Sequence, residues 1–565
     1  MIDGIHTRLG EFANDRSGRT KGITFALLWI VVFVLYYPAA LAGRVGDFPG
    51  WVKNVSTMPF LDYVNRTESH IPSLYQFTQV ITWTFYQLFK SHAWPWHLLY
   101  VTMQAVNGYL AFLLGRHMLT DTGVKNSGLI ALGGALLFCI CPHISEVVVW
   151  EPSYHYLQGL ILMYLVLLYT RRYIRTLQPK YAWIAGIIFL LSTYSLEMFY
   201  LTPVFVVLLA LYYHMALGYE RRVVIKTLTA ITLPQVILFA AHLILINAIY
   251  HSGIGHIGTQ TMHVNADNLS KPVKYIFHLI FFGRYWHDSV RQQVYRICEY
   301  KVVLAVFYLS VAALVAYIAL RIRNMRPAAK AASLYTLIVL CCAALICPIT
   351  FPDTFIAIYD RYTYVLDSFL YTLLCLLLGM ISIPVIVGAV WGIYALLNVY
   401  FTHRINKMWQ QSGNLVNKLT ETFPNDPTKT VLILNVPECY YGVQMIGSRE
   451  EGEFAIMYNA MMPQKLTNPV MEVSAYNMTD MSNGAHVTVM NDSTLHVTLN
   501  QWGTWWWWFG LGAINFENEY YRIDVKDPGH WYELTLKKQP GTYLLLYQVG
   551  DQWKHVDMHK KEPQD

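Results

Sequence analysis

Long apolar runs separated by short polar turns occupy most of residues 20–400. Most of them hold roughly the 20 residues that an α-helix needs to cross a bilayer. They predict membrane spans at 23–41, 94–115, 127–149, 154–170, 182–196, 199–216, 225–250, 302–321, 331–349, 363–380 and 383–401. The first run is too long for a signal-peptide core and has no clear cleavage site, so we expect it to remain as the first span.

The charges in the turns alternate along the chain and predict a topology. Basic residues concentrate on the cytoplasmic side of multi-spanning membrane proteins. The basic clusters are Arg171, Arg172 and Arg175, then Arg221 and Arg222, then Arg321, Arg323 and Arg326. Because the first two clusters should share a side, we expect residues 182–216 to form a hairpin. That gives about eleven spans and places the C-terminus outside. Basic residues at 403–407 would by the same rule favour the cytoplasmic side for the end of the last span.

Composition indicates a membrane protein and gives no reason to expect a nucleic-acid partner. Hydrophobic residues make up 55% of the chain and charged residues only 13%, well below the roughly 25% that is typical of soluble domains. Lys and Arg in cytoplasmic loops account for the net charge of +6, so we expect no nucleic-acid partner. Ionisable groups near a bilayer are costly unless they are paired, hydrated or in use, and the outer turns therefore predict a functional site.

Two outward segments are longer than a connection needs to be. Residues 44–93 include an aromatic stretch, 73–90, that we expect to lie as a helix at the membrane interface. Residues 251–300 carry basic groups around an apolar run, 275–282, that is too short to cross. These groups either attract an anion, such as a lipid-linked phosphate, or contact lipid headgroups. The basic groups are Lys271, Lys274, His278, Arg284 and His287, and the site candidates among them are Lys271, Lys274 and Arg284.

From about residue 420, short apolar runs bounded by Gly, Pro, Asn and Asp replace the long ones. They predict strands at 431–434, 470–474, 486–490, 495–499, 521–525, 532–536 and 542–548. We therefore expect an α-helical transmembrane domain at 1–410 and a soluble β-rich domain, α+β or β-sandwich, outside the cytoplasm at 420–565. We expect tryptophans 505–508 to pack against the transmembrane domain; the alternatives are contact with the bilayer or with a sugar.

Acids at the outer rim, cations beside them and a lipid-accessible bundle suit the transfer of a sugar from a polyprenyl phosphate. A carboxylate can take the proton of the acceptor hydroxyl, while Arg, Lys or His stabilises the leaving phosphate. The sequence contains no P-loop pattern for a nucleotide. A secondary transporter fits less well, because it would show internal repeats and place its acids near the bilayer centre.

Four motifs resemble those of the GT-C superfamily of membrane glycosyltransferases. Residues 94–107, WPWHLLYVTMQAVN, resemble that family's second span, and residues 142–150, PHISEVVVW, resemble the turn after its third span. Residues 195–197, SLE, and 360–364, DRYTY, resemble two later outer turns. Their order and spacing are most similar to the membrane module of tetratricopeptide-associated O-mannosyltransferases and bacterial relatives, over about residues 20–400.

The resemblance implies an inverting enzyme with a polyprenyl-phosphate-linked sugar donor and a protein, glycan or lipid acceptor. It implies that Asp47 in the first outer loop is the catalytic base, with Asp62 in reserve, and that Arg361 faces the phosphate. The other implied substrate-binding residues are His143, Glu146, Glu151, His155, Glu197 and Asp360. The alternative for Glu146 and Glu197 is that they cap helix ends or pair with Arg361, and His143 could be an ordinary interfacial histidine.

The chain also departs from that family. Asp47 stands alone where adjacent acids are common, Leu196 replaces a lysine, and a β-rich domain stands where tetratricopeptide repeats follow. The alternative function is therefore an inactive relative that binds a lipid-linked glycan or scaffolds a membrane complex; we favour the enzyme.

Cofactor and location are the remaining expectations. The sequence shows no metal cluster, and a divalent cation bound by Asp47 and phosphate oxygens stays open. We prefer a bacterial inner membrane, with the active face toward the periplasm, over the endoplasmic reticulum, on resemblance alone. The oligomeric state stays open.

Overall fold

A computed structural model describes residues 18–42, 45–46, 48–65, 74–251, 266–346, 360–446, 453–499, 515–527 and 531–558. The chain divides into two compact units. The first comprises Met1–Tyr36, Pro59–Leu88 and Pro95–His403, and the second comprises Tyr37–Met58, Phe89–Trp94 and Arg404–Asp565. Asp47 and residues 505–508 lie outside the described residues.

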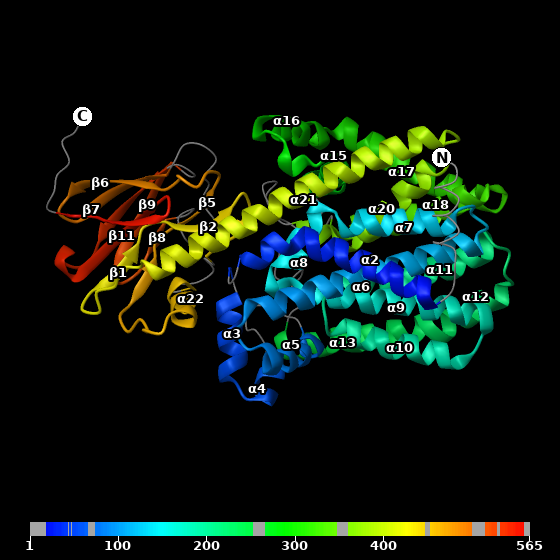
Figure 1. The fold of residues 1–565 in the computed structure, drawn as a ribbon, viewed down its shortest axis with the longest axis horizontal. Coiled ribbons are helices and arrows are strands. Elements are labelled where there is room, and N and C mark those ends of the chain that lie inside the picture. The colour runs from blue at the N-terminus through cyan, green and yellow to red at the C-terminus, as the bar shows by residue number, and fades with distance from the viewer. Residues whose placement is uncertain are drawn as a thin grey trace. The chain divides into compact units, whose positions relative to one another are not determined.

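The regular elements described in the first unit are all helices, and a helix is present at each of the predicted spans (Figure 1). Its helices are α2 (Gly18–Tyr36), α4 (Phe60–Val64), α5 (Gln76–Phe89), α6 (Ala93–Asp121), α7 (Ser127–Cys139), α8 (Ser145–Val149), α9 (Tyr154–Thr176), α10 (Pro179–Thr193), α11 (Thr202–Met215), α12 (Arg221–Thr227), α13 (Leu233–Tyr250), α15 (Ala266–Phe281), α16 (Asp288–Glu299), α17 (Lys301–Arg321), α18 (Pro327–Ile346), α20 (Tyr364–Leu378) and the first half of α21 (Pro384–Glu421).

The chain is an integral, multi-pass membrane protein. Among the described residues eight helices are long and apolar enough to cross a membrane, or nine if the bent pair α7 and α8 counts as one span. The predicted spans at α9 and α10 do not meet this criterion. With 15 residues, α10 is short for a span, and α9 begins with polar aromatic residues and ends with arginines. The described helices therefore support fewer spans than the roughly eleven expected from the sequence.

Pro142 breaks the predicted span at 127–149. A proline has no backbone N–H and cannot continue a helical hydrogen-bond ladder. The chain bends by 52° between Ser127–Cys139 and Pro142–Val149. The hydroxyl of Thr402 donates to the Ile140 carbonyl over 2.6 Å, which satisfies a group that the break leaves without a helical partner. The bend ends in the 3-10 turn η2 (Pro142–Ile144) and the short helix α8, which carry His143 and Glu146.

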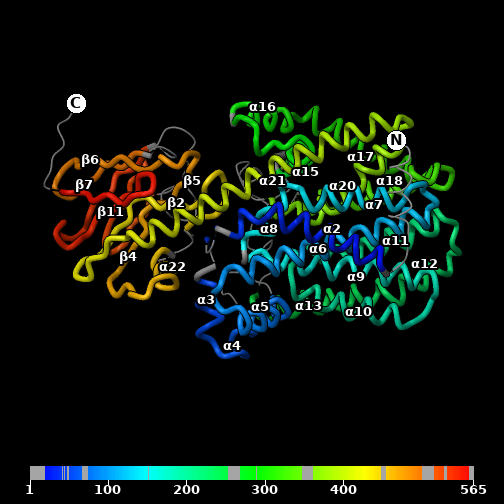
Figure 2. Tube along the Cα trace, in the orientation of Figure 1, coloured from blue at the N-terminus to red at the C-terminus, as the bar shows by residue number. Residues whose placement is uncertain are grey.

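Close packing fixes the start of α20 beside this bend. Helices α7 and α20 lie side by side (Figures 1 and 2). A Cβ placed on Gly134 would lie 2.7 Å from the Cα of Thr372, so this contact requires glycine. Small residues allow membrane helices to approach this closely. The 3-10 turn η8 (Asp360–Thr363) leads directly into α20 and carries Asp360 and Arg361.

The two long outward segments are also helical. Helix α5 lies within the predicted interfacial stretch, and its place at a membrane interface stays a prediction. The second segment forms α15 and α16, joined by the turn η6 (Gly283–Tyr285). Neither α15 nor α16 is among the helices that could span a membrane, as expected for an apolar run that is too short to cross.

The second unit contains the β-rich region. All seven predicted strands are present among β1 (Thr430–Ile433), β2 (Val436–Tyr440), β3 (Val443–Gln444), β4 (Val470–Glu472), β5 (Ala475–Met478), β6 (Ala485–Asn491), β7 (Thr494–Leu499), β8 (Phe516–Glu517), β9 (Tyr521–Asp527), β10 (Trp531–Leu536), β11 (Tyr543–Val549) and β12 (Gln552–His555). They form sheets of order β12-β11-β1-β4, β6-β7-β10-β9-β8 and β3-β2-β5. Because β1 runs parallel to β4 and β11 and α22 (Glu453–Met461) packs on α3 (Phe48–Thr57), the unit is of the α+β type.

Candidate functional site

Two predicted site residues, 215 positions apart in the chain, form a buried ion pair. The Arg361 guanidinium contacts the Glu146 carboxylate through Nη1, and the Arg361 backbone N–H donates to Glu146 Oε2 over 3.2 Å. The guanidinium also lies over two aromatic rings, 4.9 Å from the Trp150 centroid and 5.1 Å from that of Tyr362. The pair therefore fixes the turn before α20 against α8.

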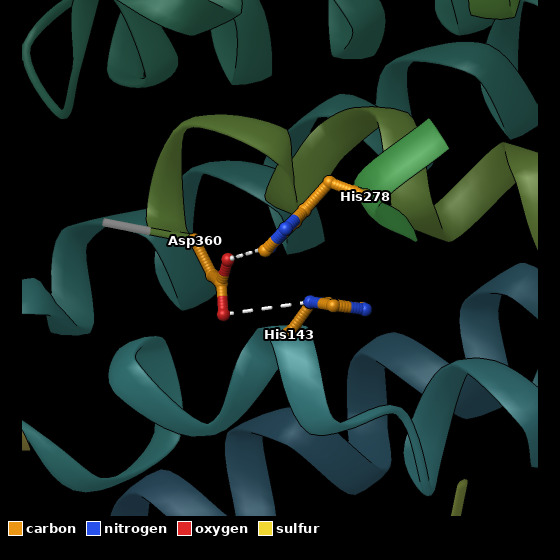
Figure 3. Close-up of side chains that lie close together, drawn as sticks. All are labelled: His143, His278 and Asp360. Carbon is orange, nitrogen blue, oxygen red and sulfur yellow. Dashed lines mark hydrogen bonds and ion pairs between the residues drawn. The ribbon is translucent and has the colours of Figure 1, made fainter. Parts of the chain in front are cut away.

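Asp360, the neighbour of Arg361, is the centre of a second cluster (Figure 3). His278 Nε2 lies 2.9 Å from Asp360 Oδ1, and Arg284 Nη1 donates to Asp360 Oδ2 over 2.9 Å. His143 Nδ1 lies 3.4 Å from the same Oδ2. Asp360 and the two histidines have at most 1% of their side-chain surface exposed. We call His143, His278, Arg284 and Asp360 the Asp360 cluster.

Charge is balanced among these buried groups. A buried charge is costly unless an opposite charge and hydrogen bonds compensate it. Arg284 compensates Asp360, and Arg361 compensates Glu146. Burial lowers the pKa of His278 to about 4, so this imidazole is neutral near pH 7. Neutral imidazole is the form that binds metal ions.

Three members of the Asp360 cluster could hold a metal ion. One ligand atom each from His143, His278 and Asp360 lies within 4.8 Å of the other two. The sequence showed no such group and left a divalent cation open; the structure brings these three residues together. The ligands come from η2, α15 and η8, which are far apart in the chain, so no spacing motif in the sequence could indicate them.

Glu197 lies near this site without joining its ion pairs. It begins the 3-10 turn η4 (Glu197–Leu201) and is buried. The Tyr75 hydroxyl donates to its carboxylate over 3.3 Å. The Tyr156 phenol lies close enough to interact electrostatically with both Glu146 and Glu197. The described contacts therefore tie Glu197 to tyrosines and show no pairing with Arg361.

The lysines of the outward segment have protein partners. Lys271 Nζ donates to Asn268 Oδ1 over 2.7 Å, and Lys274 Nζ pairs with Glu299 Oε1 over 2.6 Å. Both lysines are buried, with 2% and 1% exposure. The described partners of both lysines are therefore protein groups.

The other predicted site residues are not brought into the cluster by the described contacts. His155 is half-buried among the rings of Tyr75 and Tyr156, with centroids 5.9 and 4.9 Å away. Asp62 is exposed on α4. The Glu151 side chain, like Asp47, lies outside the described residues.

Sequence reasoning gave no individual role to two participants, His278 and Trp150. His278 falls in the basic outward segment, beside Arg284, and only the folding of α15 brings it to Asp360. Trp150 closes the motif at 142–150, and its ring under Arg361 gives that motif residue a physical role.

Comparisons with known proteins give a weak likeness in fold. No family model matches the chain, and no curated protein matches it. Solved structures of the oligosaccharyltransferase of Archaeoglobus fulgidus are similar. Its complex with Zn and sulfate has a TM-score of 0.37 at 13% identity, over 78% of this chain and 62% of that chain.

The apo form of the same protein has a TM-score of 0.38 at 12% identity, over 79% of this chain and 64% of that chain. Its complex with an inhibitory peptide and a dolichol-phosphate has a TM-score of 0.33 at 12% identity, over 78% and 64%. The chain thus spans less than two thirds of the length of these structures. At these scores the likeness assigns neither a family nor a function.

Proposed function

We propose that the chain is a GT-C-type membrane glycosyltransferase that moves a sugar from a polyprenyl-phosphate donor to an acceptor outside the cytoplasm. One observation carries the proposal: residues of two separate motifs, Glu146 and Arg361, meet in a buried pair beside a second buried guanidinium, that of Arg284. Guanidinium groups suit phosphate, because their planar fork matches two phosphate oxygens at once. A bacterial inner membrane, with the site toward the periplasm, and a soluble domain at 420–565 belong to the same proposal.

The chemistry assigns different tasks to the acids. Asp47 takes the proton of the acceptor hydroxyl as its oxygen attacks the anomeric carbon, with Asp62 as the reserve base. The bond between that carbon and the phosphate oxygen breaks, its electron pair leaves with the phosphate, and the configuration inverts. Arg361 stabilises the negative charge on the leaving group. Glu146 orients Arg361, because its two carboxylate oxygens contact the backbone N–H and the guanidinium of that residue.

A second candidate function is an inactive relative that binds a lipid-linked glycan. The pairing within the site supports it: Glu146 and Asp360 are each paired with an arginine, so neither of these two acids is placed as a catalytic base. Both functions require binding of the lipid phosphate, and only the enzyme requires transfer. A transfer assay on a protein that binds the donor therefore separates them.

The binding step is tested with Arg361→Ala in nanodiscs that contain a polyprenyl phosphate. A hydrogen bond to a charged group contributes about 1.5–3 kcal/mol, so we expect affinity to fall roughly 10- to 100-fold. Arg171→Ala is the matched control, because Arg171 also forms a buried pair, with Asp121 over 2.6 Å, between the C-terminal ends of α6 and α9. Unchanged affinity in Arg361→Ala, or an equal loss in both variants, would exclude the phosphate role.

A further inference from the structure

We propose that His143, His278 and Asp360 bind a transition-metal ion, with Zn²⁺ as the best match, and that the ion joins the three segments that carry them. Two imidazoles and one carboxylate are ligands that zinc accepts in proteins. The proposal does not depend on glycosyl transfer, and its tests use metal binding alone.

The ligand atoms lie close enough together to reach one ion after small movements, and at present the two imidazoles contact different oxygens of Asp360. Two ligands that each lie about 2.1 Å from a tetrahedral zinc ion are roughly 3.4 Å apart. The Nδ1 of His143 is 3.4 Å from Asp360 Oδ2, and the Nε2 of His278 is 2.9 Å from Asp360 Oδ1. The two imidazoles approach the same carboxylate from different elements (Figure 3). Small side-chain movements bring three such atoms, all within 4.8 Å of one another, to coordination distance.

The hydrogen-bonding state of His143 points to a ligand. Its side chain has no exposed surface, its Nδ1 lies 3.4 Å from Asp360 Oδ2, and its Nε2 has no hydrogen-bond partner among the described residues. A buried polar group without a partner costs about 1–3 kcal/mol, and an ion is one of the explanations for such a group. The Nδ1 of His278 also lacks a partner in the described part of the chain.

Arg284 is compatible with this site as a positioning residue. A carboxylate offers about four lone-pair positions on two oxygens, so Asp360 can accept from Arg284 and still coordinate an ion. Residues that hydrogen-bond a ligating carboxylate fix its orientation. The competing explanation is that Asp360 serves only as the counter-ion of Arg284. Three protein ligands also leave a fourth position for an oxygen of water or phosphate.

A bound ion would cross-link distant parts of the chain. Its ligands lie on η2, α15 and η8, so it would hold α15 against the break after α7 and the start of α20. Anything that binds only the folded state stabilises it. Zinc should therefore raise the unfolding temperature of the protein.

The test uses the full chain in nanodiscs, stripped with a chelator and titrated with Zn²⁺ alone. We expect one tightly bound zinc per chain, a higher unfolding temperature and, with Co²⁺ in its place, the visible absorption of a tetrahedral site. His278→Gln should lose roughly 100-fold or more in zinc affinity. His242→Gln is the matched control: His242 is also buried, with 3% exposure, and bonds Tyr200 over 2.8 Å outside the cluster.

A wild-type protein that binds zinc no better than His278→Gln would overturn the proposal. If His278→Gln does not fold, His143→Gln takes its place. The Co²⁺ spectrum of the wild type decides independently of any variant, since an octahedral, water-like spectrum also overturns the site. Loss of zinc with intact binding of polyprenyl phosphate leaves the proposed function standing.

Discussion

The pair between Glu146 and Arg361 should be asymmetric in its contribution to stability. Removing one partner of a buried ion pair costs about 3–5 kcal/mol, because the remaining charge is left uncompensated. In Arg361→Gln the remaining charge is the carboxylate of Glu146, which is 4% exposed and keeps only the backbone N–H of residue 361 among its described donors. We therefore expect the full cost of about 3–5 kcal/mol for this variant.

Glu146→Gln should cost less. The Arg361 side chain that it leaves behind is 12% exposed and still lies over the rings of Trp150 and Tyr362. A cation over an aromatic ring contributes about 0.5–2 kcal/mol. Glu146→Gln keeps this contribution and Arg361→Gln loses it, so we expect Glu146→Gln to cost less by about that amount. The double variant removes both charges, so it should be more stable than the sum of the two single effects predicts, by at least about 1 kcal/mol.

The free energy of unfolding is measured by titrating detergent-solubilised protein with SDS and following helicity by circular dichroism. The three variants and the wild type form a double-mutant cycle, which isolates the interaction between the two side chains. Additive effects would show that the pair does not interact in the folded protein. A larger cost for Glu146→Gln than for Arg361→Gln would refute the role assigned to the aromatic rings.

Three other variants test separate parts of the structure. Asp47→Asn should abolish sugar transfer and leave membrane insertion intact, so full activity in a transfer assay would remove Asp47 from the mechanism. Gly134→Ala should destabilise the contact with Thr372 by about 1–3 kcal/mol, because the new methyl would lie 2.7 Å from a backbone atom; an unchanged unfolding temperature would contradict this. Asp121→Asn should destabilise the helical bundle, because Arg171 donates to both oxygens of the Asp121 carboxylate over 2.6 and 2.7 Å. A free energy of unfolding equal to that of the wild type would show that the pair contributes nothing.

Local patterns in the sequence were sufficient for most elements. Runs of about 20 apolar residues predict spanning helices because the bilayer sets their length, and every such run proved helical. The strands of the second unit were predicted from short runs between turn residues. Five of the described strands were missed. Strands β3 and β8 have only two residues each, β2 and β5 follow the preceding strand after two residues, and β12 is short and largely exposed.

Contacts between distant segments could be predicted only in part. The motifs at 142–150 and 360–364 contain residues that contact each other in the structure, and the pairing of Glu146 with Arg361 was among the alternatives. The partners of Asp360 could not be foreseen, because the orientation of α15 decides whether His278 and Arg284 face the bundle or the lipid. A periodic pattern shows which face of a helix is apolar, and it does not show which other helix packs against that face.

The adjacency of Asp360 and Arg361 has a consequence for communication across the site. The two residues share one peptide bond, yet Asp360 binds groups on α15 and η6, while Arg361 binds Glu146 on α8. A ligand that displaces Glu146 from Arg361 and an ion that binds Asp360 must therefore act on the same turn. Such linkage is reciprocal. If the ion changes the affinity for lipid phosphate by some factor, lipid phosphate changes the affinity for the ion by the same factor. The turn at 360–363 would thus couple the affinity for lipid phosphate to the affinity for metal.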